Sequence, residues 1–182
     1  REQVKHFFHT TFPDFYDLMP NIADVWEDHP LSSLAIIRCY PWTRGKTALI
    51  GDAAHATVPF YGQGMNCGFE DCTALWELMK KHNENWTSIF KEYQQARKPE
   101  GDGVQDLSLD NYHVMRDYVA NPEFLLQKKF ENRITQLYPE KYTPLYSKVA
   151  FSHIPYSVAY KEGQEQDKYI KDLLRKHDIG AL

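Results

Sequence analysis

Apolar residues recur at helical spacing along most of this chain of 182 residues. The clearest run follows Gly64 and alternates steps of four and three, as expected for one buried face of a helix; its members are Met65, Phe69, Cys72, Trp76 and Met79. This helix is expected to end near His82 and Asn83. Further helices are predicted over residues 2–11, 15–19, 87–97, 104–119, 123–137 and 157–176, separated mainly by Pro13, the turn-forming residues 99–103 and Asn121-Pro122.

Two apolar runs have the character of strands rather than helices. Residues 32–40 include Leu34, Ile36 and Ile37 and end at Pro41, which predicts a strand. Residues 47–51 are short and apolar on both faces, which predicts a strand inside a sheet. We therefore assign the chain to the α/β class, mostly helical in this part, with its strands belonging to a larger sheet.

Composition and charge narrow the range of functions. The formal net charge is −4 and Lys and Arg are scattered, so no nucleic-acid partner is expected. The cysteines number three, and Cys67 and Cys72 fall on different helix faces; neither a disulfide framework nor a metal site is expected. No apolar run approaches the ~20 residues that span a bilayer. The chain opens on Arg1 inside a helical pattern, so we expect it to be part of a longer protein.

The first candidate for chemistry is Asp52, which directly follows the strand predicted over residues 47–51. A carboxylate on such a turn can accept hydrogen bonds from the hydroxyls of a sugar or ribitol chain. Asp is also a leading N-cap residue of helices, and the spacing does not decide between the two interpretations. His55 is expected to be structural. Glu70 and Asp71 are expected to face solvent or to cap the helix, without an acid–base role.

The second candidate is the glycine loop that opens the next helix, from Gly62 to Gly68. Residues 52–61 separate it from Gly51, so it cannot be the tight pyrophosphate turn of a dinucleotide fingerprint. Paired glycines allow positive φ and a close approach of the backbone to a flat ring. Free amides at a helix N-terminus suit an electron-rich ring such as a flavin; here they belong to Gly64, Met65 and Asn66. The alternative is an ordinary loop-to-helix junction.

Two further groups of residues could contact a ligand. Pro59 and Phe60 precede the loop and suit an apolar wall that keeps water out, although a lone Phe more often packs in a core. Asn111 and Met115 are four residues apart and share a helix face, which suits an amphipathic aromatic ligand or, alternatively, a core face with one satisfied amide. No nucleophile constellation is present in the sequence, and no catalytic side chain is assigned.

The segment Gly51-Asp52-Ala53-Ala54-His55 resembles the second FAD motif of the p-hydroxybenzoate hydroxylase-like aromatic hydroxylases. Residues 59–66, 68–71, 109–116 and 144–146 resemble the kynurenine 3-monooxygenase branch of that family. The resemblance implies the C-terminal part of a Rossmann-like FAD-binding monooxygenase fold, without the N-terminal dinucleotide-binding portion. Residues 1–100 would hold the end of the substrate domain and the FAD motif, and residues 101–182 a helical region that caps the substrate.

The same resemblance implies a reaction and a site. Bound FAD, transient NADPH and O₂ would hydroxylate L-kynurenine to 3-hydroxykynurenine through a flavin C4a-hydroperoxide. The implied cofactor contacts are Asp52, Gly62, Gln63, Gly64, Met65 and Asn66, and the implied substrate contacts are Pro59, Phe60, Gln63, Asn111, Met115 and Tyr146. A hydroxylase of phenolic acids and a non-catalytic flavin-binding protein remain alternatives. Eukaryotic members are anchored to the mitochondrial outer membrane by a C-terminal apolar helix, which the charged residues 168–182 do not resemble.

Overall fold

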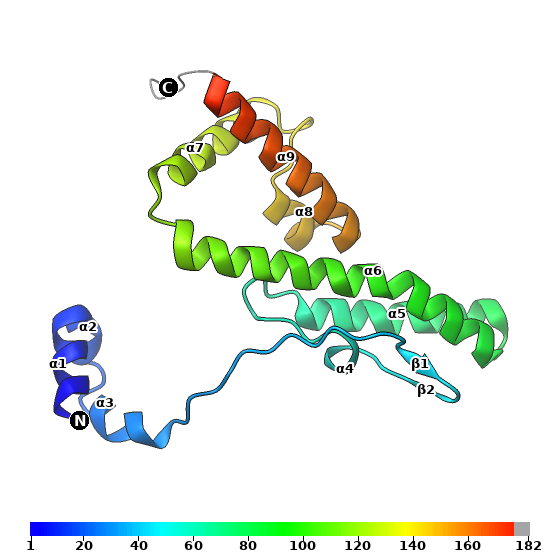
Figure 1. The fold of residues 1–182 in the computed structure, drawn as a ribbon, viewed down its shortest axis with the longest axis horizontal. Helices are drawn as coiled ribbons and strands as arrows, with labels where there is room; N and C mark the ends of the chain where they lie inside the picture. The colour runs from blue at the N-terminus through cyan, green and yellow to red at the C-terminus, as the bar shows by residue number, and fades with distance from the viewer. Residues whose placement is uncertain (177–182) are drawn as a thin grey trace. The chain divides into compact units, whose positions relative to one another are not determined.

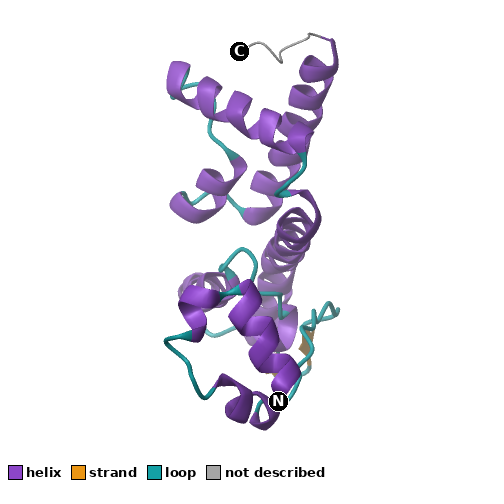
Figure 2. Ribbon diagram, turned by 90° about the vertical axis from the view of Figure 1, so that its left-hand side faces the viewer, coloured by secondary structure: helices purple, strands orange, loops and turns teal. Residues whose placement is uncertain are grey.

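The computed structural model describes residues 1–176, so the last part of the charged C-terminal segment lies outside the described residues. The chain divides into two compact units, Arg1–Leu34 and Ala35–Leu182. The described residues are mostly helical, as predicted, with one small sheet (Figure 2). Within residues 1–176 there is no helix of the length and apolar character that a bilayer crossing requires.

The first unit consists of short helices around an aromatic cluster. They are α1 (Glu2–Thr11), α2 (Pro13–Tyr16), α3 (Ile22–Val25) and the 3-10 helix η1 (Trp26–Asp28). Pro13 occupies the first turn of α2, where its missing N–H leaves no partner unsatisfied. The Phe8 ring lies 5.6 Å from that of Trp26, so α1 is tied to η1 through aromatic contacts. The helix predicted over residues 15–19 corresponds to α2, which begins earlier, at Pro13, and is shorter, ending at Tyr16.

The second unit begins with a hairpin and continues with long helices (Figure 1). The elements are β1 (Thr43–Arg44), β2 (Thr47–Ala48), α4 (Asp52–His55), α5 (Gly64–His82), α6 (Trp86–His113), the π-helix η2 (Val114–Tyr118), α7 (Pro122–Leu137), α8 (Leu145–Phe151) and α9 (Tyr156–Lys176). The two strands are antiparallel, with Thr43 opposite Ala48. Helix α6 packs against both α5 and α9, and α8 packs against α9.

Two buried clusters hold the second unit together. The larger one joins α5, α6, α8 and α9 and consists of Cys67, Val104, Leu107, Val149, Tyr156 and Ala159. The smaller one lies between the hairpin, α4 and α6 and consists of Trp42, Ala54 and Tyr93. Gly103 allows α6 to approach α9 closely, because a Cβ there would lie 2.7 Å from the backbone nitrogen of Ser157.

The strands predicted over residues 32–40 and 47–51 are not formed as expected. Residues 32–40 contain no strand, and the second run is reduced to Thr47–Ala48. A strand requires partners for its backbone N–H and C=O groups. Within residues 1–176, β1 and β2 pair only with each other, and Ile37 finds a partner in the carbonyl of Ala56 at 3.1 Å.

The predicted break at residues 99–103 is also wrong. Helix α6 runs from Trp86 to His113 with Pro99 inside it. An internal Pro removes one hydrogen bond and bends a helix rather than always ending it. Packing against α5 and α9 on its sides holds α6 together through this region. The domain boundary expected at residue 100 falls inside this continuous helix and stays a prediction.

The face of α5 that the apolar spacing indicated is not the buried one among the described residues. Met65, Phe69 and Trp76 are 71%, 63% and 58% exposed, whereas Cys67 and Asp71 are buried. The reason is that α6 packs on the side of α5 that carries Asp71, and partners on α4 and α6 neutralise that carboxylate.

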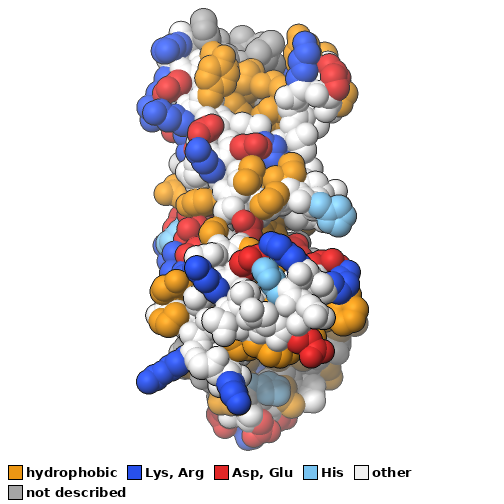
Figure 3. All heavy atoms as spheres, turned by 90° about the vertical axis from the view of Figure 1, so that its right-hand side faces the viewer, with side chains coloured by type: hydrophobic (Ala, Val, Ile, Leu, Met, Phe, Trp, Pro, Cys, Tyr) orange, Lys and Arg blue, Asp and Glu red, His pale blue; other side chains and the backbone are white. Residues whose placement is uncertain are grey.

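On the face seen in Figure 3, basic, acidic and hydrophobic side chains are interspersed and form no continuous basic surface.

Candidate functional site

Asp52 lies in a turn whose backbone only glycine adopts readily. Gly51 precedes it with φ 58° and ψ −139°, a region that is essentially restricted to glycine. Gly51, not Asp52, is the N-cap of α4, so the N-cap interpretation of Asp52 is wrong. The Asp52 side chain is exposed, and no hydrogen bond to it is formed within residues 1–176. Its carboxylate is therefore available to an external ligand.

The segment from Gly51 to Thr57 packs against the first turns of α5. A Cβ at Gly64 would lie 3.3 Å from the methyl group of Thr57, and a Cβ at Gly68 would lie 3.7 Å from the Cα of Gly51. The free carboxylate and the N-terminal amides of α5 are thus on adjacent segments. These first amides have no partner within the helix, and the N-cap residue Gln63 provides no side-chain cap.

The side chain of Gln63 points into the fold rather than outward. Gln63 is buried, and its Oε1 accepts hydrogen bonds from Asn66 Nδ2 at 2.9 Å and from the Tyr156 hydroxyl at 3.3 Å. The glycine loop is thereby attached to α9. Gly62 has φ 69°, so a left-handed residue is needed there, as the paired glycines indicated. A direct contact of the Gln63 side chain with a ligand stays a prediction.

The structure brings together three of the predicted substrate contacts. Asn111, near the end of α6, donates from Nδ2 to the carbonyl of Phe60 at 2.6 Å and lies 3.8 Å from the sulfur of Met115. The Phe60 ring packs on that of Tyr112 at 4.8 Å between centroids. Met115 belongs to the π-helix η2, a type of segment that is frequent at functional sites.

Tyr146 is connected to this group through Tyr61. At the second position of α8, Tyr146 stacks on Tyr61 with 5.7 Å between centroids, and Tyr61 is the neighbour of Phe60. Tyr146 is exposed, whereas burial raises the pKa of Tyr61 to about 12. Tyr61 and Tyr112 fall inside the segments 59–66 and 109–116, but the spacing of residues gives no sign of their ring contacts with Tyr146 and Phe60. Pro59 is exposed and starts this segment.

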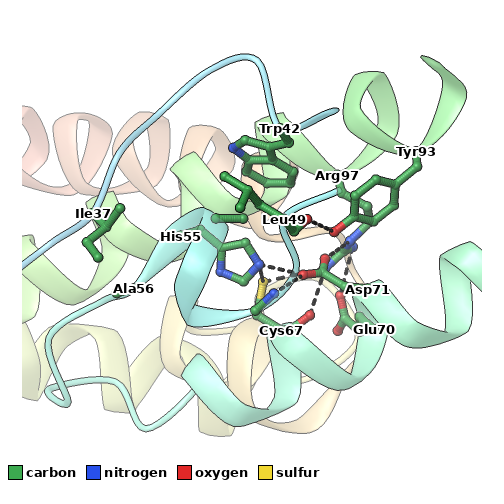
Figure 4. A network of polar contacts seen from close by, with 12 residues as sticks. Ile37, Trp42, Leu49, His55, Ala56, Cys67, Glu70, Asp71, Tyr93 and Arg97 are labelled. Carbon is green, nitrogen blue, oxygen red and sulfur yellow. Dashed lines mark hydrogen bonds and ion pairs between the residues drawn. The ribbon is translucent and has the colours of Figure 1, made fainter. Parts of the chain in front are cut away.

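A buried ionic network joins α4, α5 and α6 (Figure 4). Asp71 is fully buried; its Oδ2 accepts from His55 Nε2 at 2.6 Å and its Oδ1 from Arg97 Nε at 2.7 Å. Arg97 also donates to Glu70 Oε2 at 3.1 Å and to the carbonyl of Cys67 at 3.2 Å. The expectation that Asp71 faces solvent or caps the helix is therefore wrong, because cations from α4 and α6 offset the desolvation of its carboxylate.

The contacts within this network favour the charged forms of both Asp71 and His55. Burial by itself would raise the pKa of Asp71, but hydrogen bonds from His55, Arg97 and the Gly51 amide outweigh it and hold the pKa below its usual value. Burial likewise disfavours the charged form of His55, but its contacts with Asp71 and Cys67 raise its pKa to about 10. Removing one partner from such a buried pair typically destabilises a protein by about 3–5 kcal/mol.

The same cluster contains residue types that bind metal ions, but it also contains a cationic side chain that disfavours a metal ion. The potential ligand atoms of His55, Cys67 and Asp71 lie within 4.8 Å of one another. Arg97 is inside this group, with Nη2 3.4 Å from the Cys67 sulfur. A guanidinium already supplies the positive charge that a metal ion would bring, so the arrangement suits an ionic network rather than metal coordination.

Comparison with known proteins finds similarity to FAD-dependent enzymes. A family described as an FAD binding domain matches residues 32–108. Kynurenine 3-monooxygenases of Flavobacterium psychrophilum and Flavobacterium johnsoniae are 46% and 44% identical over 180 residues, which make up 98% of this chain and 40% of each relative. That of Dictyostelium discoideum is 37% identical over 191 residues, covering 98% of this chain and 42% of the relative. Over nearly its whole length, the chain is similar to kynurenine 3-monooxygenases. It spans about two fifths of the length of the curated relatives it matches.

The residues around Asp52 fit the cofactor of an FAD-binding family. FAD carries ribitol hydroxyls, which can donate hydrogen bonds to an unpartnered carboxylate such as that of Asp52. It also carries a ring system that is negatively charged when reduced, which the N-terminus of the 19-residue helix α5 would stabilise. At Gly51 and Gly62 a Cβ would meet nothing within 4 Å, so their surroundings leave room for a ligand.

Proposed function

We propose that this chain forms the flavin and substrate side of an FAD- and NADPH-dependent monooxygenase that converts L-kynurenine and O₂ to 3-hydroxykynurenine. The observation that carries the proposal is the unpartnered Asp52 carboxylate beside the N-terminus of α5, in a chain 46% identical to a kynurenine 3-monooxygenase. A Rossmann-like sheet that includes residues 47–51 is part of this proposal, as is the helical capping role of residues 101–182.

The proposed cofactor contacts are distributed over two segments. Asp52 accepts hydrogen bonds from the ribitol chain, and the amides of Gly64, Met65 and Asn66 face the pyrimidine edge of the flavin. A helix N-terminus favours negative charge by roughly 0.3–1 kcal/mol when exposed and by more when partly buried. When bound and reduced by NADPH, FAD would supply the activation of O₂, while the chain supplies orientation and excludes water.

The proposed substrate contacts combine apolar and polar groups. Phe60 and Met115 form an apolar wall for the ring, with Pro59 and the glycine loop beside it. The hydrogen bond to the Phe60 carbonyl orients the Asn111 amide and leaves its oxygen free to accept from the polar end of kynurenine. The exposed hydroxyl of Tyr146 would donate to the substrate carboxylate. Because the aniline nitrogen already activates the ring, orientation matters more here than a strong base.

The alternatives differ in the polar contacts that they require. A phenolic acid offers no amino-acid end for Asn111 and Tyr146, so these residues favour kynurenine. A non-catalytic flavin-binding protein would not need the contact between Asn111 and Phe60. A location at the mitochondrial outer membrane, which the resemblance implies for eukaryotic members, stays a prediction; the relatives include bacterial proteins and one from Dictyostelium discoideum.

The test is NADPH oxidation by the full-length, FAD-loaded protein with and without L-kynurenine, with the product identified by mass spectrometry. We expect kynurenine to stimulate oxidation and to gain one oxygen atom. If salicylate or 4-hydroxybenzoate stimulates NADPH oxidation instead, the substrate is a phenolic acid and not kynurenine. A protein that binds no FAD would refute the flavin assignment as a whole.

A further inference from the structure

We propose that Asp71, held by His55 and Arg97, is a positioning residue that sets the Gly51–Asp52 turn for the cofactor. This inference rests on the proposed function, because it concerns how Asp52 is presented to FAD. Asp71 itself is fully buried and acts through the backbone of Gly51, so it is not a catalytic residue.

The first argument is that one carboxylate oxygen clamps both ends of α4. Asp71 Oδ2 accepts from the amide of Gly51 at 3.1 Å, just before the helix, and from His55 Nε2 at 2.6 Å, at its last residue. A helix of this length has no stability of its own, since a single turn is an unfavourable nucleus. The orientation of Asp52, which lies between the two clamped residues, is therefore set by Asp71.

The second argument is that Gly51 needs this acceptor in its unusual conformation. With φ 58° and ψ −139°, Gly51 turns its N–H toward α5, where Asp71 receives it. Without the carboxylate this amide would lose its acceptor, and the turn would be free to relax to a conformation in which water or another group accepts from it. Asp52 follows Gly51 directly and would change direction with it.

The third argument is that the carboxylate itself cannot move. Arg97 holds its other oxygen at 2.7 Å, and Gly101, one turn further along α6, lets the helix come close to His55. A Cβ at Gly101 would lie 3.0 Å from the Cβ of His55, and the ring of Trp42 lies 5.3 Å from the imidazole. For stability alone, apolar side chains of similar volume could replace a buried ionic cluster; fixing a particular turn requires the directional hydrogen bonds.

The test is FAD affinity of the full-length apoprotein, measured by titration of flavin fluorescence. His55→Leu and Asp71→Asn remove hydrogen bonds of the clamp, whereas His55→Gln keeps a side-chain donor toward Asp71. We expect His55→Leu and Asp71→Asn to raise the Kd for FAD about tenfold to a hundredfold, as for the loss of a hydrogen bond to a charged group. His55→Gln should restore most of the affinity. At saturating FAD, the KM for L-kynurenine should stay unchanged in all three variants.

A matched control separates positioning from general destabilisation. Gln127 is also buried and donates from Nε2 to Glu131 within α7 and to Asp167 on α9, so Gln127→Met should lower Tm and leave the Kd for FAD unchanged. If Gln127→Met weakens FAD binding as much as His55→Leu at equal loss of Tm, the positioning role is wrong. It is also wrong if Asp52→Ala weakens binding while folded His55→Leu and Asp71→Asn do not, although the flavin site then stands. If Asp52→Ala has no effect, the positioning role and the assignment of Asp52 fail together.

Discussion

Replacing Gly103 with Ala tests the close approach of α6 and α9, on which the glycine loop depends. A Cβ at this position would lie 2.7 Å from the nitrogen of Ser157 and 2.9 Å from the carbonyl carbon of Tyr156. Both are backbone atoms and cannot rotate away, so the two helices must separate. Tyr156 would move with α9, and its hydroxyl is the group of α9 that donates to Gln63.

The expected magnitude follows from opposing effects. Ala is favoured over Gly inside a helix by about 0.8–1 kcal/mol, whereas overpacking costs about 1–3 kcal/mol. Separation also strains the two hydrogen bonds that Ser157 donates to the Glu100 carboxylate, at 3.1 and 2.7 Å, each of which contributes about 0.5–1.5 kcal/mol. We expect a net loss of about 1–3 kcal/mol in the free energy of unfolding.

The measurement is urea unfolding followed by far-UV circular dichroism, with Gly68→Ala as the matched control. Gly68 is also inside a helix, but a Cβ there would lie 3.7 Å from the Cα of Gly51, an ordinary contact. We therefore expect Gly68→Ala to increase stability by about 0.5–1 kcal/mol. If Gly103→Ala also increases stability, the close packing of α6 on α9 is refuted, and with it the route by which α9 holds the glycine loop.

Three further outcomes are expected. Tyr146→Phe should raise the KM for L-kynurenine with FAD affinity retained, and unchanged kinetics would remove Tyr146 from the site. Asn111→Leu should leave the Phe60 carbonyl without its donor and raise the same KM; an unaltered KM would reduce Asn111 to a packing residue. The raised pKa of His55 adds stability that is complete below about pH 6.5 and is lost as the pH rises toward 10. The difference in Tm between wild type and His55→Gln should shrink over that range, and a constant difference would contradict a charged His55.

Most helices could be predicted because their ends depend on neighbouring residues. Asn121 accepts from the amides of Glu123 and Phe124 and is followed by Pro122 at the first helical position, so α7 begins within one residue of the predicted start. At the end of α5, Asn83 adopts the left-handed conformation with φ 45°, a known helix stop. These signals act over a few residues and require no knowledge of the rest of the fold.

The network around Asp71 could not be predicted, because its members are far apart in the sequence. Arg97 lies 26 residues after Asp71 and His55 lies 16 residues before it. Apolar spacing assumes that a carboxylate faces water, and that assumption fails when cations from two other elements meet it inside the fold. The same reasoning explains why α6 continues through Pro99, since Arg97 before the proline bonds to Asp71 and Gly101 after it lets the helix lie close to Trp42 and His55.

In the candidate site, the resemblance indicated which residues take part but not what each of them contacts. Resemblance indicated Phe60 and Asn111 as neighbours of a substrate, and the structure does bring them together. It also shows that the Asn111 amide is already used on the Phe60 carbonyl, so Asn111 can act on a ligand mainly through its remaining oxygen. An amide fixed in this way is a directional acceptor rather than a flexible contact. Replacing Asn111 with Asp would therefore remove the donor that fixes the side chain but keep an acceptor. If the KM for kynurenine of Asn111→Asp is as high as that of Asn111→Leu, the substrate requires the fixed orientation of the acceptor and not only its presence.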